Sequence, residues 1–463
     1  MPAPATDARQ DAVRIASVAS QLRAHLQSWF DERGRAERIE SLDVEYLIYM
    51  PGTDFAALYA ATLRRGDEIE RALLFGNIRY DDDAAALVAK AEQRAARGKF
   101  ARPRLGEPAY HLPALGMALW TYPNDPKLKT LRASLEPDAV RSALGNLGGP
   151  DGKRDAGWQV GAYDSTLVRY IPRKRVVLRY EIEWRQARGA DGGPRSDPSS
   201  RLTHVYAKLF DTAEQAAQAA AVLEVLSRAA QADRRALRVP QPLYVDAEHH
   251  VVYQSALPGE LLVRSADDVT PARVAEIGRG LALFQQSRLP IRATLTLDGE
   301  LEKSLEAARL VSMVHPDLAP ALGRLTGRLE RALGGLSRLP LVPCHGTFKL
   351  AHLLSDGPRI GLVDFDSVVL ADPIYDVANF VADLHYLEAG GALPAGRAER
   401  LGNAFHDAWC AQVPWGRRDT ALDWYVASLL VRKQALKPVK HLHADAAPKM
   451  ARILDAARRR LGA

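Results

Sequence analysis

The sequence predicts an α+β protein in which a β-rich region precedes a largely helical one. Residues 165–256 contain several runs of β-branched and aromatic residues, as strands do. From Pro258 onward the chain becomes rich in leucine and alanine, with recognisable starts of helices. Within this second region, residues 341–384 hold two short apolar strands, LVPC and IGLVDF, which each open onto a polar cluster. We expect the functional site at this stretch.

Composition and charge narrow the classes of function. At 463 residues, with 47% hydrophobic and 25% charged residues, the chain has the composition of a soluble globular protein with two or three domains. The net charge of +6 comes without a concentrated basic patch or a nucleic-acid-binding motif, so we expect no nucleic-acid partner. Two cysteines exclude a disulfide framework. No apolar run approaches the ~20 residues of a membrane helix, and we expect a cytoplasmic protein.

Residues 1–150 are expected to form an N-terminal cap region. Apolar residues at helical spacing predict an amphipathic helix over 11–32. Two apolar runs around Pro51-Gly52 then predict a hairpin. This hairpin has a weak counterpart later in the chain, because Tyr49-Met50-Pro51 resembles Tyr170-Ile171-Pro172. Either the two hairpins share ancestry, or both follow the same local rules; we favour the second interpretation.

Residues 151–258 are expected to form a β-rich lobe and residues 259–463 a helical lobe. In the first, two strands joined at Pro172 are followed by a linker rich in Gly, Pro and Ser, and by a third strand ending near Lys208. Asp211-Thr212 predicts the start of a helix that reaches about Arg228, and two further strands follow. After Pro258, Thr270-Pro271 begins the first of several predicted helices.

The two polar clusters predict a phosphate and metal site. The first is His345-Gly346-Thr347, with His352 five residues after the threonine. The second is Asp364-Phe365-Asp366. An ionised carboxylate such as that of Asp364, directly after an apolar strand, is costly unless it is paired or bound to a metal. A structural helix cap is the alternative role for it. The chain contains no Walker-type phosphate-binding loop.

This stretch resembles the catalytic core of the aminoglycoside phosphotransferase and choline kinase family, which has a bilobal protein-kinase-like fold. That family carries His-Gly-Asp, an Asn five residues later (Gln in the maltokinase-like branch), and then Asp-Phe/Trp-Asp/Glu. Here the His-Gly pair and the Asp-Phe-Asp triplet are intact, but Thr347 stands where the catalytic Asp is expected and His352 where the Asn is. The resemblance covers roughly residues 160–440, and the N-terminal cap resembles that of the maltokinase-like branch.

The resemblance implies a nucleotide site in the β-rich lobe. Lys208 would bridge the nucleotide phosphates, with the helix residue Glu224 as its counter-charge; a solvent-exposed lysine is the alternative. Arg173 and Lys174 lie in the loop that covers the phosphates in this family, although the loop here lacks glycine. They bind phosphates as long cations or form a merely solvated hairpin. Gln254 and Ala256 lie where the backbone contacts adenine.

The resemblance further implies ATP and Mg²⁺ as cofactors. Asp364 is the predicted metal ligand, with His352 and Asp366 as further candidates, although imidazole is softer than Mg²⁺ prefers. Thr347, Lys349 and Asp364 are the predicted catalytic residues. A threonine hydroxyl cannot serve as the carboxylate that accepts the substrate's proton. Lys349 adds a cation that can stabilise the charge of a transferring phosphate.

Three functions follow from these residues. The first is an ATP- and Mg²⁺-dependent phosphotransferase acting on a hydroxyl of a small metabolite such as a sugar or amino alcohol. The second is a pseudokinase, a nucleotide-binding or scaffold protein without turnover, which Thr347 favours. The third is altered chemistry such as nucleotidyl transfer. The basic C-terminal segment, Arg432 to Arg460, is interpreted as a solvated helix face. The acceptor and the oligomeric state are not encoded in any pattern we find.

Overall fold

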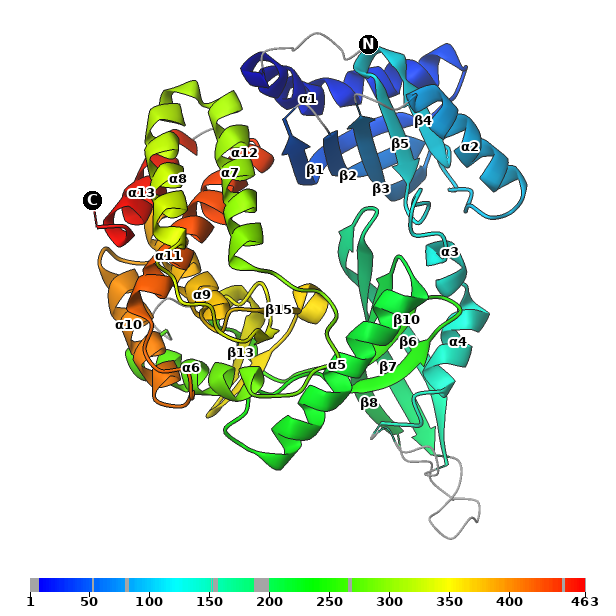
Figure 1. Cartoon of the computed structure of the whole chain (residues 1–463). Coiled ribbons are helices and arrows are strands. Elements are labelled where there is room, and N and C mark those ends of the chain that lie inside the picture. Colours follow the sequence, from blue (N-terminus) through cyan, green and yellow to red (C-terminus); the bar gives the residue numbers. More distant parts are fainter. Residues whose placement is uncertain are drawn as a thin grey trace. The chain divides into compact units, whose positions relative to one another are not determined.

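The computed structural model describes residues 8–51, 54–79, 83–150, 152, 157–186, 200–264, 269–443 and 446–462. These residues divide into two compact units (Figure 1). Unit 1 comprises residues 1–217 and 242–256, and unit 2 comprises residues 218–241 and 257–463. The boundaries predicted at residues 150 and 258 stay predictions.

Unit 1 contains two five-stranded antiparallel sheets. The first sheet has the order β1-β2-β3-β5-β4. Its strands are β1 (Arg38–Met50), β2 (Asp54–Arg65), β3 (Glu68–Arg79), β4 (Ala109–Leu112) and β5 (Met117–Thr121). The β1–β2 pair is the hairpin predicted around Pro51; Gly52 itself lies outside the described residues.

Two helices and a short 3₁₀ turn belong to this first sheet, namely α1 (Ala8–Glu32), α2 (Ala84–Ala96) and η1 (Pro113–Leu115). Two further helices, α3 (Leu131–Ser134) and α4 (Pro137–Gly145), follow it in the chain, and α4 contacts β6 (Trp158–Ile171) of the second sheet (Figure 1). α1 contacts β1 and β4, and α2 contacts β4 and β5. The apolar face of α1 is buried, including Ile15, Leu22 and Phe30, because its apolar residues recur at helical spacing. The predicted N-terminal helix is thus confirmed.

The second sheet repeats the plan of the first. Its strands are β6 (Trp158–Ile171), β7 (Arg175–Gln186), β8 (Ser200–Phe210), β9 (Pro242–Asp246) and β10 (Val251–Ser255). The order is β6-β7-β8-β10-β9, again with a helix between the third and fourth strands in sequence. This helix, α5 (Ala213–Ala232), crosses from unit 1 into unit 2. The predicted β-rich region is confirmed.

The buried carboxylate of Asp125 links the segment after the first sheet to the second sheet. It accepts hydrogen bonds from the amides of Lys127 and Leu128 at 2.7 and 2.9 Å. Its other oxygen accepts from the Tyr170 hydroxyl at 2.7 Å and from the Arg173 amide at 2.8 Å, at the end of β6. The two sheets also share one apolar core, to which residues of both contribute.

Unit 2 is mainly helical. Its helices are α6 (Pro271–Gln285), α7 (Leu297–Val314), α8 (Ala319–Leu333), α9 (Ile374–Ala389), α10 (Arg397–Cys410), α11 (Asp419–Leu429), the π-helical η6 (Leu430–Ala435), α12 (Leu436–Lys440) and α13 (Ala446–Arg460). Short 3₁₀ turns are η2 (Leu262–Arg264), η3 (Pro316–Leu318), η4 (Leu350–His352) and η5 (Phe365–Ser367). The helical region predicted after Pro258 is confirmed. Among the described residues, no helix combines the length and apolar character needed to cross a bilayer.

Short strands in unit 2 present the predicted polar clusters. They are β11 (Glu260–Leu261), β12 (Val342–Cys344), β13 (Leu353–Asp356), β14 (Arg359–Leu362) and β15 (Val369–Ala371). β13 pairs with β14, and β12 pairs with β15. The first cluster follows β12 and the second follows β14. The α+β fold class is therefore confirmed, with sheets in unit 1 and helices around short strands in unit 2.

Candidate functional site

The carboxylate of Asp376 holds the His-Gly-Thr loop in place. The amides of His345 and Gly346 donate to its two oxygens at 2.5 and 2.9 Å. Gly346 has a φ of +82°, and a Cβ there would lie 2.1 Å from the Ser367 carbonyl oxygen, so only glycine fits. Burial in the first turn of α9 raises the pKa of Asp376 to about 6. Asp376 therefore orders this loop through its hydrogen bonds.

Two predicted metal ligands are neighbours. His352 Nε2 lies 3.3 Å from Asp364 Oδ2, and 26% of the Asp364 side chain is exposed. Asp364 adopts a left-handed conformation, with φ 71°, at the start of η5. The imidazole of His345 donates from Nε2 to the Val363 carbonyl at 3.0 Å and so fixes the residue before Asp364. Asp366 lies one residue beyond Phe365, and its side chain is exposed.

These residues fit a divalent cation only in company with other oxygen ligands. No group of three or more His, Cys, Asp or Glu side chains suited to a metal occurs in the part of the chain that the structure describes. Mg²⁺ is commonly held by one or two carboxylates together with waters and phosphate oxygens of a nucleotide. Asp364 matches that requirement, because its carboxylate is partly exposed beside the loop. The chemistry of the donors therefore fits Mg²⁺ bound jointly with phosphates.

Thr347 and Lys349 line one cavity of about 160 Å³. Its wall is completed by residues of the loop and of three helical segments, namely Phe348, Asn379, Asp383, Lys433, Gln434 and Lys437. The structure thus brings two of the predicted catalytic residues together with residues of α9, η6 and α12. All of these residues belong to unit 2.

Lys433 is the main site residue that sequence reasoning missed. Its ammonium group donates to the Gly346 carbonyl at 2.9 Å and to Asn379 Oδ1, and it lies 5.4 Å from the centre of the Tyr375 ring. Burial, followed by the nearby Arg432 charge, lowers the pKa of Lys433 to about 7. The π-helical segment η6 carries it, and such segments often occur at functional sites.

The prediction of a solvated face for the basic C-terminal segment is wrong at Lys433 and Lys437. Both side chains are half-buried and line the cavity, because residues four apart in a helix share one face. Their neighbours in the sequence SLLVRKQALKPVK are largely apolar, which is the signal that pointed to a packed helix. The contact of Lys433 with Gly346 could not be inferred from the sequence, because it forms only when distant segments pack together.

The predicted nucleotide-binding residues of the β-rich region lie in unit 1. Lys208 is half-buried on β8, where it faces Val177 of β7 and Val252 of β10 across the sheet. Gln254 is buried on β10, and Ala256 follows that strand. Their contacts with a nucleotide stay predictions.

The loop between β6 and β7 is anchored by acidic residues. Arg173 adopts a left-handed conformation with φ 64°. Its amide donates to Asp125, and its guanidinium lies 3.4 Å from Asp54 Oδ2. Lys174 is exposed beside it. A phosphate bound by Arg173 would therefore compete with Asp54 for the guanidinium.

Glu224 pairs within its own helix. Its carboxylate accepts from Arg228, four residues along α5, and 43% of its side chain is exposed. Glu224 belongs to unit 2, whereas Lys208 belongs to unit 1. The pairing of Lys208 with Glu224 stays a prediction.

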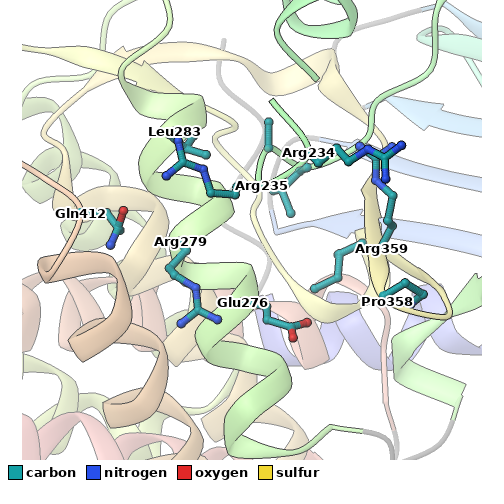
Figure 2. Close-up of a pocket in the computed structure, with 11 residues that line it drawn as sticks. Arg234, Arg235, Glu276, Arg279, Leu283, Pro358, Arg359 and Gln412 are labelled. Carbon is teal, nitrogen blue, oxygen red and sulfur yellow. The ribbon is translucent and has the colours of Figure 1, made fainter. Parts of the chain in front are cut away.

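A second cavity in unit 2, of about 220 Å³, is rich in arginine (Figure 2). Arg234 and Arg235 follow α5, Arg279 projects from α6, and Arg359 begins β14. Arg235 forms a two-point ion pair with Asp233. None of the predicted site residues lines this cavity.

A segment of the chain matches the model of a known family. The profile of the phosphotransferase enzyme family, APH, matches residues 194–413, just under half of the chain. The matched segment includes the His-Gly-Thr loop, Asp364 and Asp376. Together with the order of sheet and helices, the match supports the predicted protein-kinase-like fold. No curated protein is significantly similar to the chain in sequence.

Solved structures that resemble parts of the chain include kinases and phosphotransferases of small molecules. A choline/ethanolamine kinase family protein from Mesorhizobium loti is 19% identical, with a TM-score of 0.40, over 56% of this chain and 88% of that one. An aminoglycoside phosphotransferase from Streptomyces rimosus is 19% identical, with a TM-score of 0.35, over 64% and 98% of the two chains. A glucosamine kinase is 18% identical, with a TM-score of 0.42, over 56% and 79%. The fold assignment depends on the family match and on the strand order.

Proposed function

We propose that the protein is an ATP- and Mg²⁺-dependent phosphotransferase that acts on a hydroxyl group of a small metabolite. The observation that carries this proposal is the arrangement around the loop at Gly346. The amide of Gly346 donates a hydrogen bond to Asp376, and His352 and Asp364 are neighbours after the loop. The match of this segment to the phosphotransferase enzyme family supports the same conclusion.

Each residue has a role that its position allows. The partly exposed carboxylate of Asp364 would hold Mg²⁺ with the nucleotide phosphates. The metal, when bound, supplies positive charge that lowers the cost of bringing a nucleophile to a phosphate. Lys208 would contact the phosphates from β8. Lys349, at the cavity wall, supplies a further cation toward the transferring group.

Thr347 sets the main limit on the reaction. Its hydroxyl can accept or donate a hydrogen bond to an acceptor alcohol, but it cannot take a proton at neutral pH as a carboxylate can. Phosphoryl transfer depends mostly on positioning and electrostatics, so the loss of the base slows the reaction without abolishing it. We therefore expect slow turnover. The pseudokinase alternative is favoured by the same threonine.

Thermal stability tests nucleotide binding first. Melting temperatures are measured with ATP or ADP, with and without Mg²⁺, for wild type, Asp364→Ala and the control Asp317→Ala, an exposed aspartate on η3. Ligand at about 100 times its Kd stabilises the folded state by about 2.7 kcal/mol. We expect a Mg²⁺-dependent rise in wild type and control that Asp364→Ala loses. No rise at millimolar nucleotide sinks the proposed function.

Product analysis separates kinase from pseudokinase. Release of ADP is measured with small hydroxyl compounds as acceptors, for wild type and Thr347→Asp. Turnover by wild type that Asp364→Ala abolishes contradicts the pseudokinase alternative. Turnover gained only in Thr347→Asp supports it, and release of pyrophosphate instead of ADP indicates nucleotidyl transfer.

A further inference from the structure

The cavity beside Thr347 gathers three lysines around a small volume. Lys349 comes from the loop, Lys433 from η6 and Lys437 from α12. Among the described residues, none of the three ammonium groups forms an ion pair. The volume of about 160 Å³ is several times the ~10–15 Å³ that one water molecule requires, so the cavity admits a small ligand group.

Positive charge dominates this cavity. Burial lowers the pKa of Lys437, and the nearby Lys349 lowers it further. The one carboxylate of the wall, Asp383, is buried, and this burial raises its pKa. Like charges held together at low dielectric repel one another, and this repulsion adds to the effect of burial in lowering the pKa of Lys433 and of Lys437. An anion bound here would relieve that repulsion.

Two of the three lysines, Lys433 and Lys437, are also held in position. Lys433 is fixed by the Gly346 carbonyl and by Asn379. The ammonium group of Lys437 lies 4.2 Å from the centre of the Tyr386 ring, a favourable cation–π contact. Their side chains therefore lose little further freedom when a ligand binds. Thr347 and Gln434 add neutral hydrogen-bonding groups to the same wall.

We propose that this cavity binds an anionic group of the acceptor, a carboxylate or a phosphate, so that the acceptor is a negatively charged hydroxyl compound. The assignment of this anion to an acceptor rests on the proposed phosphotransferase function, and it specifies the chemical class of the acceptor substrate. A cationic amino alcohol is disfavoured, because its ammonium group would meet three lysines. A phosphate bound here has two sources, the acceptor or the group transferred from the nucleotide.

Direct binding tests the cavity without any need for turnover. Affinities of inorganic phosphate, glycerate, glycerol 3-phosphate, glycerol and ethanolamine are measured by calorimetry at constant ionic strength. We expect the three anions to bind and glycerol and ethanolamine to bind at least tenfold more weakly. Equal affinity for ethanolamine and glycerate overturns the proposal. Absence of anion binding overturns it too.

Matched variants locate the site. Lys437→Met and Lys349→Met each remove one positive charge from the cavity and keep most of the side chain. Arg279→Met removes one positive charge from the arginine-rich cavity of Figure 2 in the same unit. We expect at least a tenfold loss of anion affinity in the lysine variants and none in Arg279→Met. The reverse pattern assigns the anion to the arginine-rich cavity and overturns the proposal. Unfolding curves without ligand identify any variant that fails to fold. If one lysine variant fails to fold, the anion affinity of the other lysine variant tests the proposal.

Competition separates the two sources of the anion. If glycerate or phosphate binds as tightly with a saturating, non-hydrolysable ATP analogue and Mg²⁺ as without, the cavity serves the acceptor. If the ATP analogue displaces the anion but ADP does not, the lysines hold the transferred phosphate and the acceptor assignment fails. If nucleotide binds but no anion binds, only this inference is contradicted. If anions bind but nucleotide does not raise the melting temperature, the phosphotransferase function is contradicted and the anion site is retained.

Discussion

The two sheets of unit 1 have the same strand order but different side chains at matching positions. Each runs first-second-third-fifth-fourth, with a helix after the third strand. The hairpins also match in register, since Met50 faces Asp54 in the first and Ile171 faces Arg175 in the second. Ala56, two residues after Asp54, faces Asn77 on β3. Val177, two residues after Arg175, faces Lys208 on β8 in the same way.

Asn77 is thus the counterpart of Lys208. Asn77 is buried and donates to Asp54 Oδ1 at 2.5 Å and to the Phe55 carbonyl at 3.0 Å. Lys208 is half-buried on a strand that the family profile covers, whereas the first sheet lies outside the matched residues. The difference teaches that the same backbone plan supports a structural amide in one sheet and the predicted phosphate-binding cation in the other.

The largest effect is expected from Asp125→Ala, which breaks the link between the sheets. Four hydrogen bonds to a buried carboxylate are lost, two of them to Tyr170 and Arg173 of the second sheet. We expect the free energy of unfolding to fall by about 4 kcal/mol, measured by denaturant titration. Asp67→Ala, at an exposed turn, is the control. A loss below about 1 kcal/mol means that the sheets do not depend on this carboxylate.

Asn77→Leu tests the structural half of the comparison. It removes the donor to Asp54 and to the buried Phe55 carbonyl, and we expect a loss of about 2–3 kcal/mol in the free energy of unfolding. The affinity for Mg²⁺-ATP should not change. An unchanged stability, or a loss of nucleotide binding in a folded variant, contradicts the assignment of Asn77 as purely structural.

Lys208→Leu tests the other half at the matching position. Hydrogen bonds between a lysine and phosphates contribute about 1.5–3 kcal/mol, so we expect the affinity for Mg²⁺-ATP to fall by about tenfold or more. Stability should fall by less than in Asn77→Leu. Calorimetric titration with ATP measures the first effect and denaturant titration the second. Identical behaviour of the two variants would remove the distinction between the sheets.

The smallest effect is expected from Arg173→Gly, which makes the second hairpin loop resemble the first. The first loop is Pro51-Gly52-Thr53 and the second is Pro172-Arg173-Lys174. A left-handed conformation costs a non-glycine residue about 1 kcal/mol, and the partly exposed pair with Asp54 contributes a similar amount or less. We expect stability to change by less than about 1 kcal/mol, seen as a small shift of the melting temperature. A destabilisation of several kcal/mol shows instead that the Asp54 pair holds the loop.

Sequence patterns predicted what depends on local order. The α+β class, the N-terminal helix and the hairpin at Pro51 follow from periodicity and turn residues, and the structure confirms them. The polar clusters were likewise visible because each follows a short apolar strand. The weak similarity of the two hairpins was interpreted as common local rules, whereas the structure shows that both hairpins belong to sheets of the same strand order. The position of the fifth strand between the third and fourth is a long-range pairing that no local pattern contains.

The rest of the site depends on contacts between distant segments. Lys433 meets Gly346 across 87 residues, and Arg173 meets Asp54 across 119. In the sequence, a lysine that lines a cavity looks the same as one on a solvated helix face. The difference arises only when the helix packs, which is why the C-terminal segment was misread.

The π-helical segment η6 has a consequence for how this chain can change over generations. A π-helical turn bonds i to i+5 and so holds one more residue than an α-helical turn. Loss of one codon within it would restore α-helical spacing and leave the side chains of α12 facing nearly the same way, because the π-helical turn is what accommodates the extra residue. Loss of one codon in α11 instead, where no extra residue is available, would turn Lys433 and Lys437 by about 100° away from the cavity. The chain can therefore shorten by one residue at this segment, and not in α11, without losing Lys437 from the cavity wall.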